Sequence, residues 1–276
     1  MNGFQKRKSV MPKIKSNGIN INYEEWGSGE PLLLLMGITA PGAAWELHAN
    51  EYKKHFRCIL LDNRGAGASD KPEGEYTTEL MASDAVKVMD ALGIDRFHVS
   101  GISMGGAIAQ HVAITHPKRV KSCVMSAAWA FCSNYMKHVF DMFKNTRSSL
   151  APGNFSQMFL LWLYSSKFYG EHPLQMLENI QGHASDPSPM PRSAFESQAA
   201  ACVNHDTRSQ LRHIIAPVLI TTGSKDIFVP IECAHYLHEN IKNSLLEVFD
   251  GYAHVHHWED LDRYNKVTCE FLLKNN

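Results

Sequence analysis

Short apolar segments alternate with longer segments of helical periodicity along most of the chain. Most of the apolar segments are rich in branched aliphatic residues, the pattern of strands covered on both faces, and they lie at 19–26, 31–36, 57–62, 97–100, 120–126, 217–222 and 244–249. Helical periodicity is found at 44–55, 78–92, 104–116, 230–240 and 262–274. Repeated strand–helix units predict an α/β fold: a mostly parallel, twisted sheet with helices on both faces.

One region interrupts this alternation. Residues 130–212 contain helical stretches rich in Met, Phe, Tyr and Trp, broken by Pro152 and by the proline-rich run 186–191. A helical subdomain inserted into the parallel-sheet domain explains this order of elements. We therefore predict a first part of the core at 1–129, a helical cap at 130–212 and a second part of the core at 213–276.

Composition limits the classes of partner. The 276 residues carry a formal net charge of −1, so no global field favours nucleic acid or an anionic membrane. No apolar run reaches the length of a membrane span, and the N-terminal stretch lacks a signal-peptide core. The six cysteines have no C-x-x-C spacing, which favours free thiols. We expect a cytoplasmic protein without nucleic-acid partner or stable membrane insertion, and we expect the basic N-terminal end, Lys13 and Lys15 included, to be solvated.

The segment Gly101-Ile102-Ser103-Met104-Gly105 carries the strongest chemical signal. It lies directly between a predicted strand and a predicted helix, where a sharp turn would hold the Ser103 hydroxyl clear of the backbone. Gly101 and Gly105 leave room for strand and helix to converge. The helix N-terminus would direct backbone N–H groups toward a developing oxyanion. We predict that Ser103 is a nucleophile.

At this point the chain resembles the α/β-hydrolase family over nearly its whole length. The loop 62–69 is similar to the family's D-x-R-G-x-G-x-S motif, Gly37 followed by Trp45 resembles the segment with the oxyanion hole, and 206–217 looks like the return from the cap. The chain is most similar to small cap-bearing serine esterases, enol-lactonases and non-haem haloperoxidases. The resemblance implies a hydrolase with no cofactor.

A serine nucleophile needs a base, and the base needs an orienting acid. The family's chain order is Ser, acid, His, and Asp226 lies in a segment similar to the family's G-x-x-D-x-x-V-P loop. Three histidines crowd the expected base position. Ala253-His254, with Glu259 following, fits the family pattern better than His256 or His257, so the resemblance implies His254 as the base. A metal site at these histidines is disfavoured because no second His/Asp cluster at ligand spacing is present.

The resemblance assigns the oxyanion hole to two backbone donors, the N–H groups of Ile38 and Met104. This chain has Met36-Gly37 where the family usually has His-Gly, which removes a polar side chain and leaves backbone donors in place. The aromatic and Met-rich cap predicts an apolar pocket.

We therefore expect hydrolysis of carboxylic esters of small to medium apolar substrates through Ser103, His254 and Asp226. The same residues would serve a lactonase, a carbon–carbon bond hydrolase or a perhydrolase. A protein of another class, a slow-turnover ligand sensor on a hydrolase scaffold, is also compatible with them. The oligomeric state stays open.

Overall fold

The computed structural model describes residues 12–185 and 189–276. Its eight-stranded sheet has the order β1-β2-β4-β3-β5-β6-β7-β8, and the neighbours from β4 onward run parallel. The strands are β1 (Lys13–Ser16), β2 (Ile19–Trp26), β3 (Glu30–Leu35), β4 (Phe56–Leu61), β5 (Phe97–Ile102), β6 (Val120–Ser126), β7 (Val218–Gly223) and β8 (Ser244–Phe249). The predicted α/β fold is confirmed.

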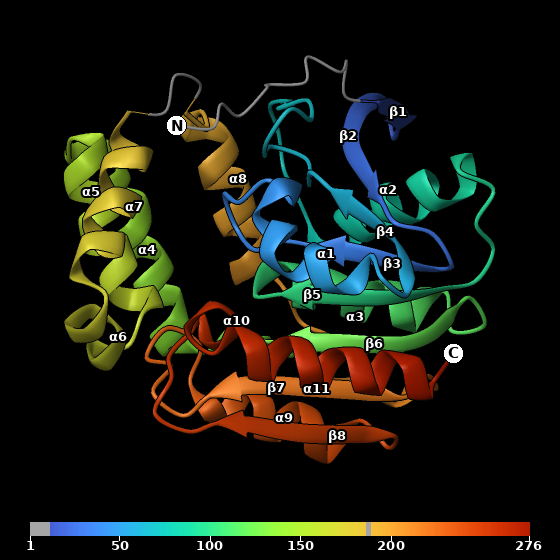
Figure 1. Ribbon diagram of the computed structural model, residues 1–276. Coiled ribbons are helices and arrows are strands. Elements are labelled where there is room, and N and C mark those ends of the chain that lie inside the picture. Colours follow the sequence, from blue (N-terminus) through green and yellow to red (C-terminus); the bar gives the residue numbers. More distant parts are fainter. Residues whose placement is uncertain (1–11, 186–188) are drawn as a thin grey trace, which may run out of the picture.

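Helices cover both faces of this sheet (Figure 1). One face carries α1 (Glu46–Tyr52) and α11 (Leu261–Lys274), and the other carries α2 (Thr78–Ala91), α3 (Met104–Thr115) and α9 (Ile231–Asn240). The short helix α10 (His256–Glu259) precedes α11. Every residue of β5 and β7 is buried, including the polar residues His98, Ser100, Thr221 and Thr222, as expected for strands that helices cover on both faces.

The first strand, β1, is absent from the sequence prediction. Lys13 and Lys15, which we expected in a solvated end, lie in β1, which pairs with β2 in an antiparallel hairpin. Asn17 and Gly18 connect the two strands with φ values of 45° and 82°. An Asn-Gly pair with positive φ at both positions is the favoured two-residue hairpin turn, so the signal was present in the sequence.

In the described residues, five α-helices lie between β6 and β7, beyond the carboxyl ends of the parallel strands (Figure 1). They are α4 (Asn134–Ser149), α5 (Pro152–Leu163), α6 (Ser166–Glu171), α7 (Pro173–Ala184) and α8 (Arg192–Val203). We call them the cap. The two ends of the cap meet, because Phe131 and Asp206 form an isolated antiparallel bridge and the N–H of Thr207 donates to the carbonyl of Ala130 at 2.8 Å.

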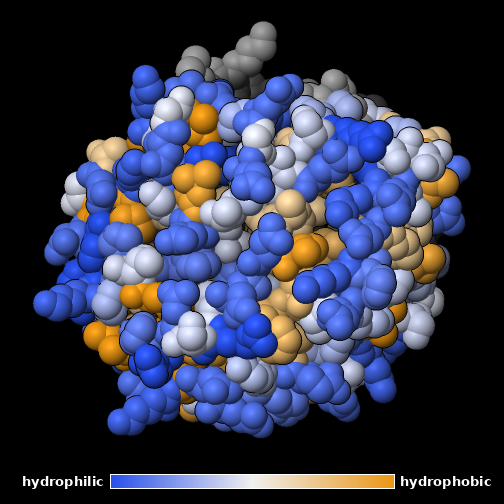
Figure 2. Space-filling view, turned by 180° about the vertical axis from the view of Figure 1, so that it is seen from behind, coloured by the Kyte–Doolittle hydropathy of each residue, from blue (hydrophilic) through white to orange (hydrophobic). Residues whose placement is uncertain are grey.

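The face seen from behind Figure 1 is mostly hydrophilic, with apolar residues in small separate groups (Figure 2). Such scattered exposure is normal for a globular protein. Within the described residues, no helix combines the length and the apolar character needed to cross a membrane.

Candidate active site

Ser103 forms the turn between β5 and α3. Its φ of 56° and ψ of −119° are values that L-residues rarely adopt, and only 4% of the residue is exposed. The Ser103 N–H donates to the carbonyl of Ser126 at 2.8 Å, which fixes the turn against the end of β6. A strained residue that the surroundings hold in place is typical of a functional position.

The glycines of this turn have no room for a side chain. A Cβ on Gly101 would lie 2.1 Å from the carbonyl oxygen of Gly105, and a Cβ on Gly105 would lie 2.1 Å from that of Leu35. Both distances are far below van der Waals contact. The sharp turn at Ser103 therefore depends on glycine at both positions.

Asp226 and His254 are hydrogen-bonded to each other at the ends of β7 and β8. The Nδ1 atom of His254 lies 2.8 Å from Oδ2 of Asp226. His254 is 3% exposed and Asp226 is 6% exposed. The other oxygen of Asp226, Oδ1, accepts from the N–H groups of Phe228 at 2.9 Å and Val229 at 2.8 Å. The acid is thus held on one side by the backbone and presents its second oxygen to the imidazole.

The other two histidines of the cluster have different partners. His256 Nε2 lies 2.9 Å from Oγ1 of Thr221, and Nδ1 of His257 lies 3.0 Å from Nε2 of His48. Burial lowers the pKa of His256 to about 3 and also lowers the pKa of His257. Of the three candidate bases, only His254 is therefore hydrogen-bonded to Asp226. In the described residues no group of His, Cys, Asp and Glu is arranged to hold a metal ion.

The predicted oxyanion segment lies against the nucleophile. A Cβ built on Gly37 would lie 3.3 Å from Cβ of Ser103 and 3.8 Å from its Oγ, so the backbone at Gly37, directly before Ile38, passes beside the Ser103 side chain. Thr39, the next residue, has a φ of 70°. Met104, the second predicted donor, is buried at the first position of α3, where helix N–H groups have no partner within the helix.

The loop after β4 is hydrogen-bonded to the segment that follows β3. Asp62 accepts from the N–H groups of Gly42 at 2.6 Å and Ala68 at 2.8 Å. The side-chain amide of Asn63 donates to the carbonyl of Met36 at 2.9 Å. The family-like motif at 62–69 therefore ties the predicted oxyanion segment to the end of β4.

The cap contributes aromatic surface beside the acid and the base. The rings of Phe228 and His254 lie 4.8 Å apart, and Phe140 and Phe143 of α4 pack on Phe228 at 5.2 and 5.3 Å. This cluster is buried. The surroundings of His254 are therefore apolar, as the aromatic composition of the cap suggests.

Two residues that join the cap to the catalytic loops were not assigned a role from the sequence. Gln198 of α8 accepts from the N–H of Thr39 at 2.9 Å. Glu259, predicted only as part of the pattern around His254, accepts from the N–H groups of Ala253 and Ser165. A buried glutamine inside a cap helix has no sequence signal of its own, because its partners lie far away along the chain.

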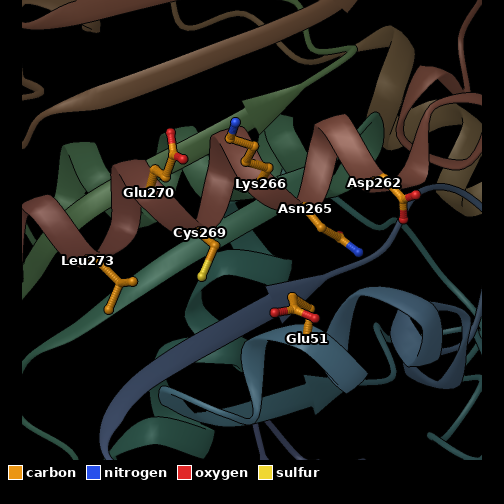
Figure 3. Close-up of a pocket in the computed structure, with 7 residues that line it drawn as sticks. All are labelled: Glu51, Asp262, Asn265, Lys266, Cys269, Glu270 and Leu273. Atoms are coloured by element: carbon orange, nitrogen blue, oxygen red, sulfur yellow. The ribbon is translucent and has the colours of Figure 1, made fainter.

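A surface pocket of about 350 Å³ lies elsewhere, between α1 and α11 (Figure 3). Glu51 of α1 lines it from one side, and Asp262, Lys266 and Glu270 of α11 line it from the other. It contains none of the predicted catalytic residues.

The chain is similar to proteins that are named as hydrolases of several kinds. It is 32% identical to a 2-hydroxy-6-oxo-6-phenylhexa-2,4-dienoate hydrolase of Comamonas testosteroni, with 91% of each chain covered. It is 25% identical to RutD of Azorhizobium caulinodans, which bears the name of a carbamate hydrolase, covering 95% of this chain and 98% of that one. The enol-lactonase structure from Burkholderia xenovorans LB400 superposes with a TM-score of 0.86 at 21% identity, covering 95% and 100% of the two chains.

The model of the alpha/beta hydrolase fold family matches residues 30–261. That match spans the sheet from β3 to β8, the whole cap and the turns that carry Ser103, Asp226 and His254. Both the fold and the hydrolytic names of the relatives agree with it. The chain is a hydrolase of the α/β-hydrolase family.

Proposed function

We propose that this protein is a serine hydrolase that cleaves carboxylic esters of small to medium apolar substrates. The observation that carries the proposal is the buried hydrogen bond between His254 Nδ1 and Asp226 Oδ2. These two residues and Ser103 each follow the carboxyl end of a strand, β8, β7 and β5, on one edge of the sheet. A nucleophile, a base and an orienting acid on one edge are the set that acyl transfer requires.

The hydrogen bonds of Asp226 support the proposed role of His254 as the base. Because Oδ1 of Asp226 accepts two backbone N–H groups, Oδ2 is left to accept from Nδ1–H of His254. The Nε2 atom is then unprotonated and can take the proton of Ser103 as Oγ attacks the ester carbonyl. His254 returns that proton to the leaving alkoxide, and a water molecule then hydrolyses the acyl-enzyme through the same base.

The negative charge that develops on the carbonyl oxygen needs donors beside Ser103. The N–H of Met104 opens α3, and the N–H of Ile38 belongs to the segment that packs against Ser103. Donors fixed by the fold need no reorganisation during the reaction, and loss of one such donor costs about 3–4 kcal/mol of transition-state stabilisation.

The charges around the core favour an uncharged substrate. Of the Lys and Arg side chains in 12–185 and 189–276, Arg64 is the one that is buried, and its Nε lies 2.6 Å from Oδ2 of Asp84. A cation already paired in this way offers nothing to a substrate carboxylate. The aromatic cluster of Phe140, Phe143 and Phe228 beside His254 suits an apolar acyl or alcohol group.

The test is turnover of the neutral esters p-nitrophenyl acetate, butyrate and octanoate. Their turnover is compared with that of mono-p-nitrophenyl succinate, a half-ester that has the chain length of the butyrate ester but carries a carboxylate. The proposal expects repeated turnover that Ser103→Ala abolishes, with the neutral esters preferred over the half-ester. Retention of most esterase activity by Ser103→Ala would disprove the assignment of the nucleophile. Preference for the half-ester would disprove the neutral substrate class.

A second candidate is hydrolysis of a carbon–carbon bond beside a ketone. It is supported by the 32% identity to the Comamonas testosteroni enzyme over 91% of both chains. Incubation with a 2-hydroxy-6-oxo-dienoate distinguishes the two, because cleavage bleaches the conjugated dienoate. A kcat/KM for this compound above that for every ester would make carbon–carbon cleavage the main activity.

A further inference from the structure

Gln198 is a fully buried amide of the cap whose two ends contact two different loops of the core. It lies on α8, and none of its surface is exposed. Its Oε1 accepts from the backbone N–H of Thr39 at 2.9 Å, and its Nε2 donates to the backbone carbonyl of Arg64 at 2.9 Å. The carbonyl and the NH₂ group of the amide are therefore both hydrogen-bonded to the core backbone, one in the loop after β3 and the other in the loop after β4.

The contact with Thr39 falls at a position where the backbone needs support. Thr39 has a φ of 70°, a left-handed value that costs a β-branched residue free energy. A conformation of that kind persists where the surroundings hold it. The Gln198 carbonyl holds the peptide between Ile38 and Thr39 in one orientation.

The peptide that carries the Ile38 N–H is fixed from both sides. On its N-terminal side, Asn63 donates to the carbonyl of Met36 at 2.9 Å. On its C-terminal side, Gln198 accepts from Thr39. One anchor comes from the core and the other from the cap. The Gly37–Ile38 peptide lies between these anchors, and Gly37 packs against Ser103.

We propose that Gln198 is a positioning residue for the oxyanion hole, so that the hole is complete only when the cap is seated on the core. It touches no substrate and acts through the Ile38 N–H. The inference rests on the proposed function, since it concerns the donor that would stabilise the oxyanion formed by Ser103. The cap then contributes to transition-state stabilisation as well as to the walls of the pocket.

The decisive variant is Gln198→Met, which keeps the length of the side chain and removes both hydrogen bonds. A donor displaced by about 1 Å costs on the order of 100-fold in rate, so we expect kcat to fall about 10- to 100-fold. KM for a neutral ester should stay within about threefold, because the lost interaction belongs to the transition state. Gln110→Met is the matched control.

Gln110 is also a glutamine with no exposed surface, and it donates to the carbonyl of Trp129 at 3.0 Å and accepts from Thr207 at 2.7 Å. It does not contact the segment 37–39 in any hydrogen bond that the described residues show. Its replacement by Met should cost stability without a comparable fall in kcat. Equal losses of kcat in the two variants would overturn the inference.

Binding of a transition-state analogue separates positioning from a general structural effect. Ser103 Oγ would add to the carbonyl of an aryl trifluoromethyl ketone, with the carbonyl oxygen becoming the oxyanion and the serine proton passing to His254. The matching methyl ketone binds without forming a stable adduct. Gln198→Met should raise the inhibition constant of the trifluoromethyl ketone about 10- to 100-fold and leave that of the methyl ketone unchanged. A parallel rise in both constants would overturn the inference.

Gln198→Asn is the second variant in case Gln198→Met does not fold. It stays polar, but it is one methylene shorter and cannot reach both Thr39 and Arg64. The same selective loss of kcat is expected, and a wild-type kcat would overturn the inference. Failure of the proposed function itself is distinguished by the unmodified protein: if that protein hydrolyses no ester and Ser103 is not labelled by a fluorophosphonate, the serine mechanism fails first.

Discussion

The carboxylate of Glu259 accepts a hydrogen bond from the backbone N–H of Ser165, where the cap helix α6 begins. Its second oxygen accepts from the N–H of Ala253 at 2.8 Å, directly before His254. The cap is therefore joined to the loop of the candidate base. A second link joins the same regions, because the N–H of Val255 donates to the carbonyl of Leu163 at 3.1 Å.

Glu259→Gln should weaken both the fold and the activity. A glutamine side chain offers one oxygen where two N–H groups need acceptors, so its NH₂ group would face a backbone donor. We expect the free energy of unfolding to fall by about 1–3 kcal/mol and kcat to fall more than KM changes. Urea unfolding and ester kinetics measure the two effects.

Glu270→Gln is the control for Glu259→Gln. Glu270 is an exposed glutamate of α11, so its replacement removes the same charge without touching the loop of His254. If both variants behaved alike, the link between Glu259 and the cap would have no consequence for catalysis.

Asp226→Asn should nearly abolish turnover while the protein stays folded. The asparagine oxygen can still accept from Phe228 and Val229, which turns its NH₂ group toward Nδ1 of His254. The imidazole then protonates on Nε2 and can no longer take the proton of Ser103. We expect kcat to fall about 10³- to 10⁴-fold, measured with a neutral ester.

Asp250→Asn serves as the matched control for Asp226→Asn, because Asp250 is an exposed aspartate after β8 that accepts from Oγ of Ser224. It should keep wild-type kinetics. An Asp226→Asn protein with more than a tenth of the wild-type kcat would contradict the role given to Asp226.

Ser103→Gly should be more stable than Ser103→Ala. Both lack the hydroxyl and should be inactive, but only glycine adopts a φ of 56° with a ψ of −119° without strain. Glycine relieves about 1–3 kcal/mol of backbone strain, but it also raises the conformational entropy of the unfolded chain. The free energy of unfolding of Ser103→Gly should therefore exceed that of Ser103→Ala by about 1 kcal/mol. Thermal unfolding of the two variants side by side tests this, and a lower Tm for Ser103→Gly would show that the turn is unstrained.

Acid should destabilise the fold through its buried histidines. Burial lowers the pKa of His48 to about 4 and that of His256 to about 3. The unfolded chain binds these protons near pH 6.5, whereas the folded chain does not, so unfolding takes up protons below that value. Stability should therefore fall as the pH drops from about 6.5 to about 4, by up to about 1.4 kcal/mol per pH unit for each histidine.

The variant His48→Gln tests the source of this slope. Nδ1 of His48 lies 2.6 Å from Oδ1 of Asn265 and its Nε2 lies 3.0 Å from Nδ1 of His257, and the burial of this ring disfavours its protonated form. Urea unfolding between pH 5 and 8 should show a shallower slope in His48→Gln than in the unmodified protein. Replacement of the exposed His55 by Gln should leave the slope unchanged; a slope equally reduced in both would refute the assignment.

Much of the core could be predicted because its signals are local. The strands β2, β6 and β8 begin and end where the apolar pattern places them, and α2, α3 and α9 differ from their predicted bounds by one residue at one end. Buried parallel strands and helices with a single apolar face leave a clear period in the sequence. The turn at Ser103 is equally local, since its glycines and its strand–helix context are contiguous.

Features that depend on distant partners could not be predicted. Gln198 acquires its position from Thr39, which is 159 residues away in sequence, and nothing in the helical pattern of α8 marks that residue. The distinct partners of His254, His256 and His257 are set by the ends of β7 and by α1. Spacing alone placed three histidines near one another, and only the three-dimensional packing separates their roles.

The antiparallel bridge between Phe131 and Asp206 means that the cap leaves and re-enters the core at a single point. A segment whose two ends lie side by side can be exchanged for another segment without any change in the strand order of the sheet. In evolution or in the laboratory, new substrate preferences could thus arise by replacing 132–205 while β5, β7 and β8 stay unchanged. A transplanted cap would nonetheless have to bring its own counterparts of Gln198 and Ser165, or it would enclose a pocket without supporting the chemistry beneath it.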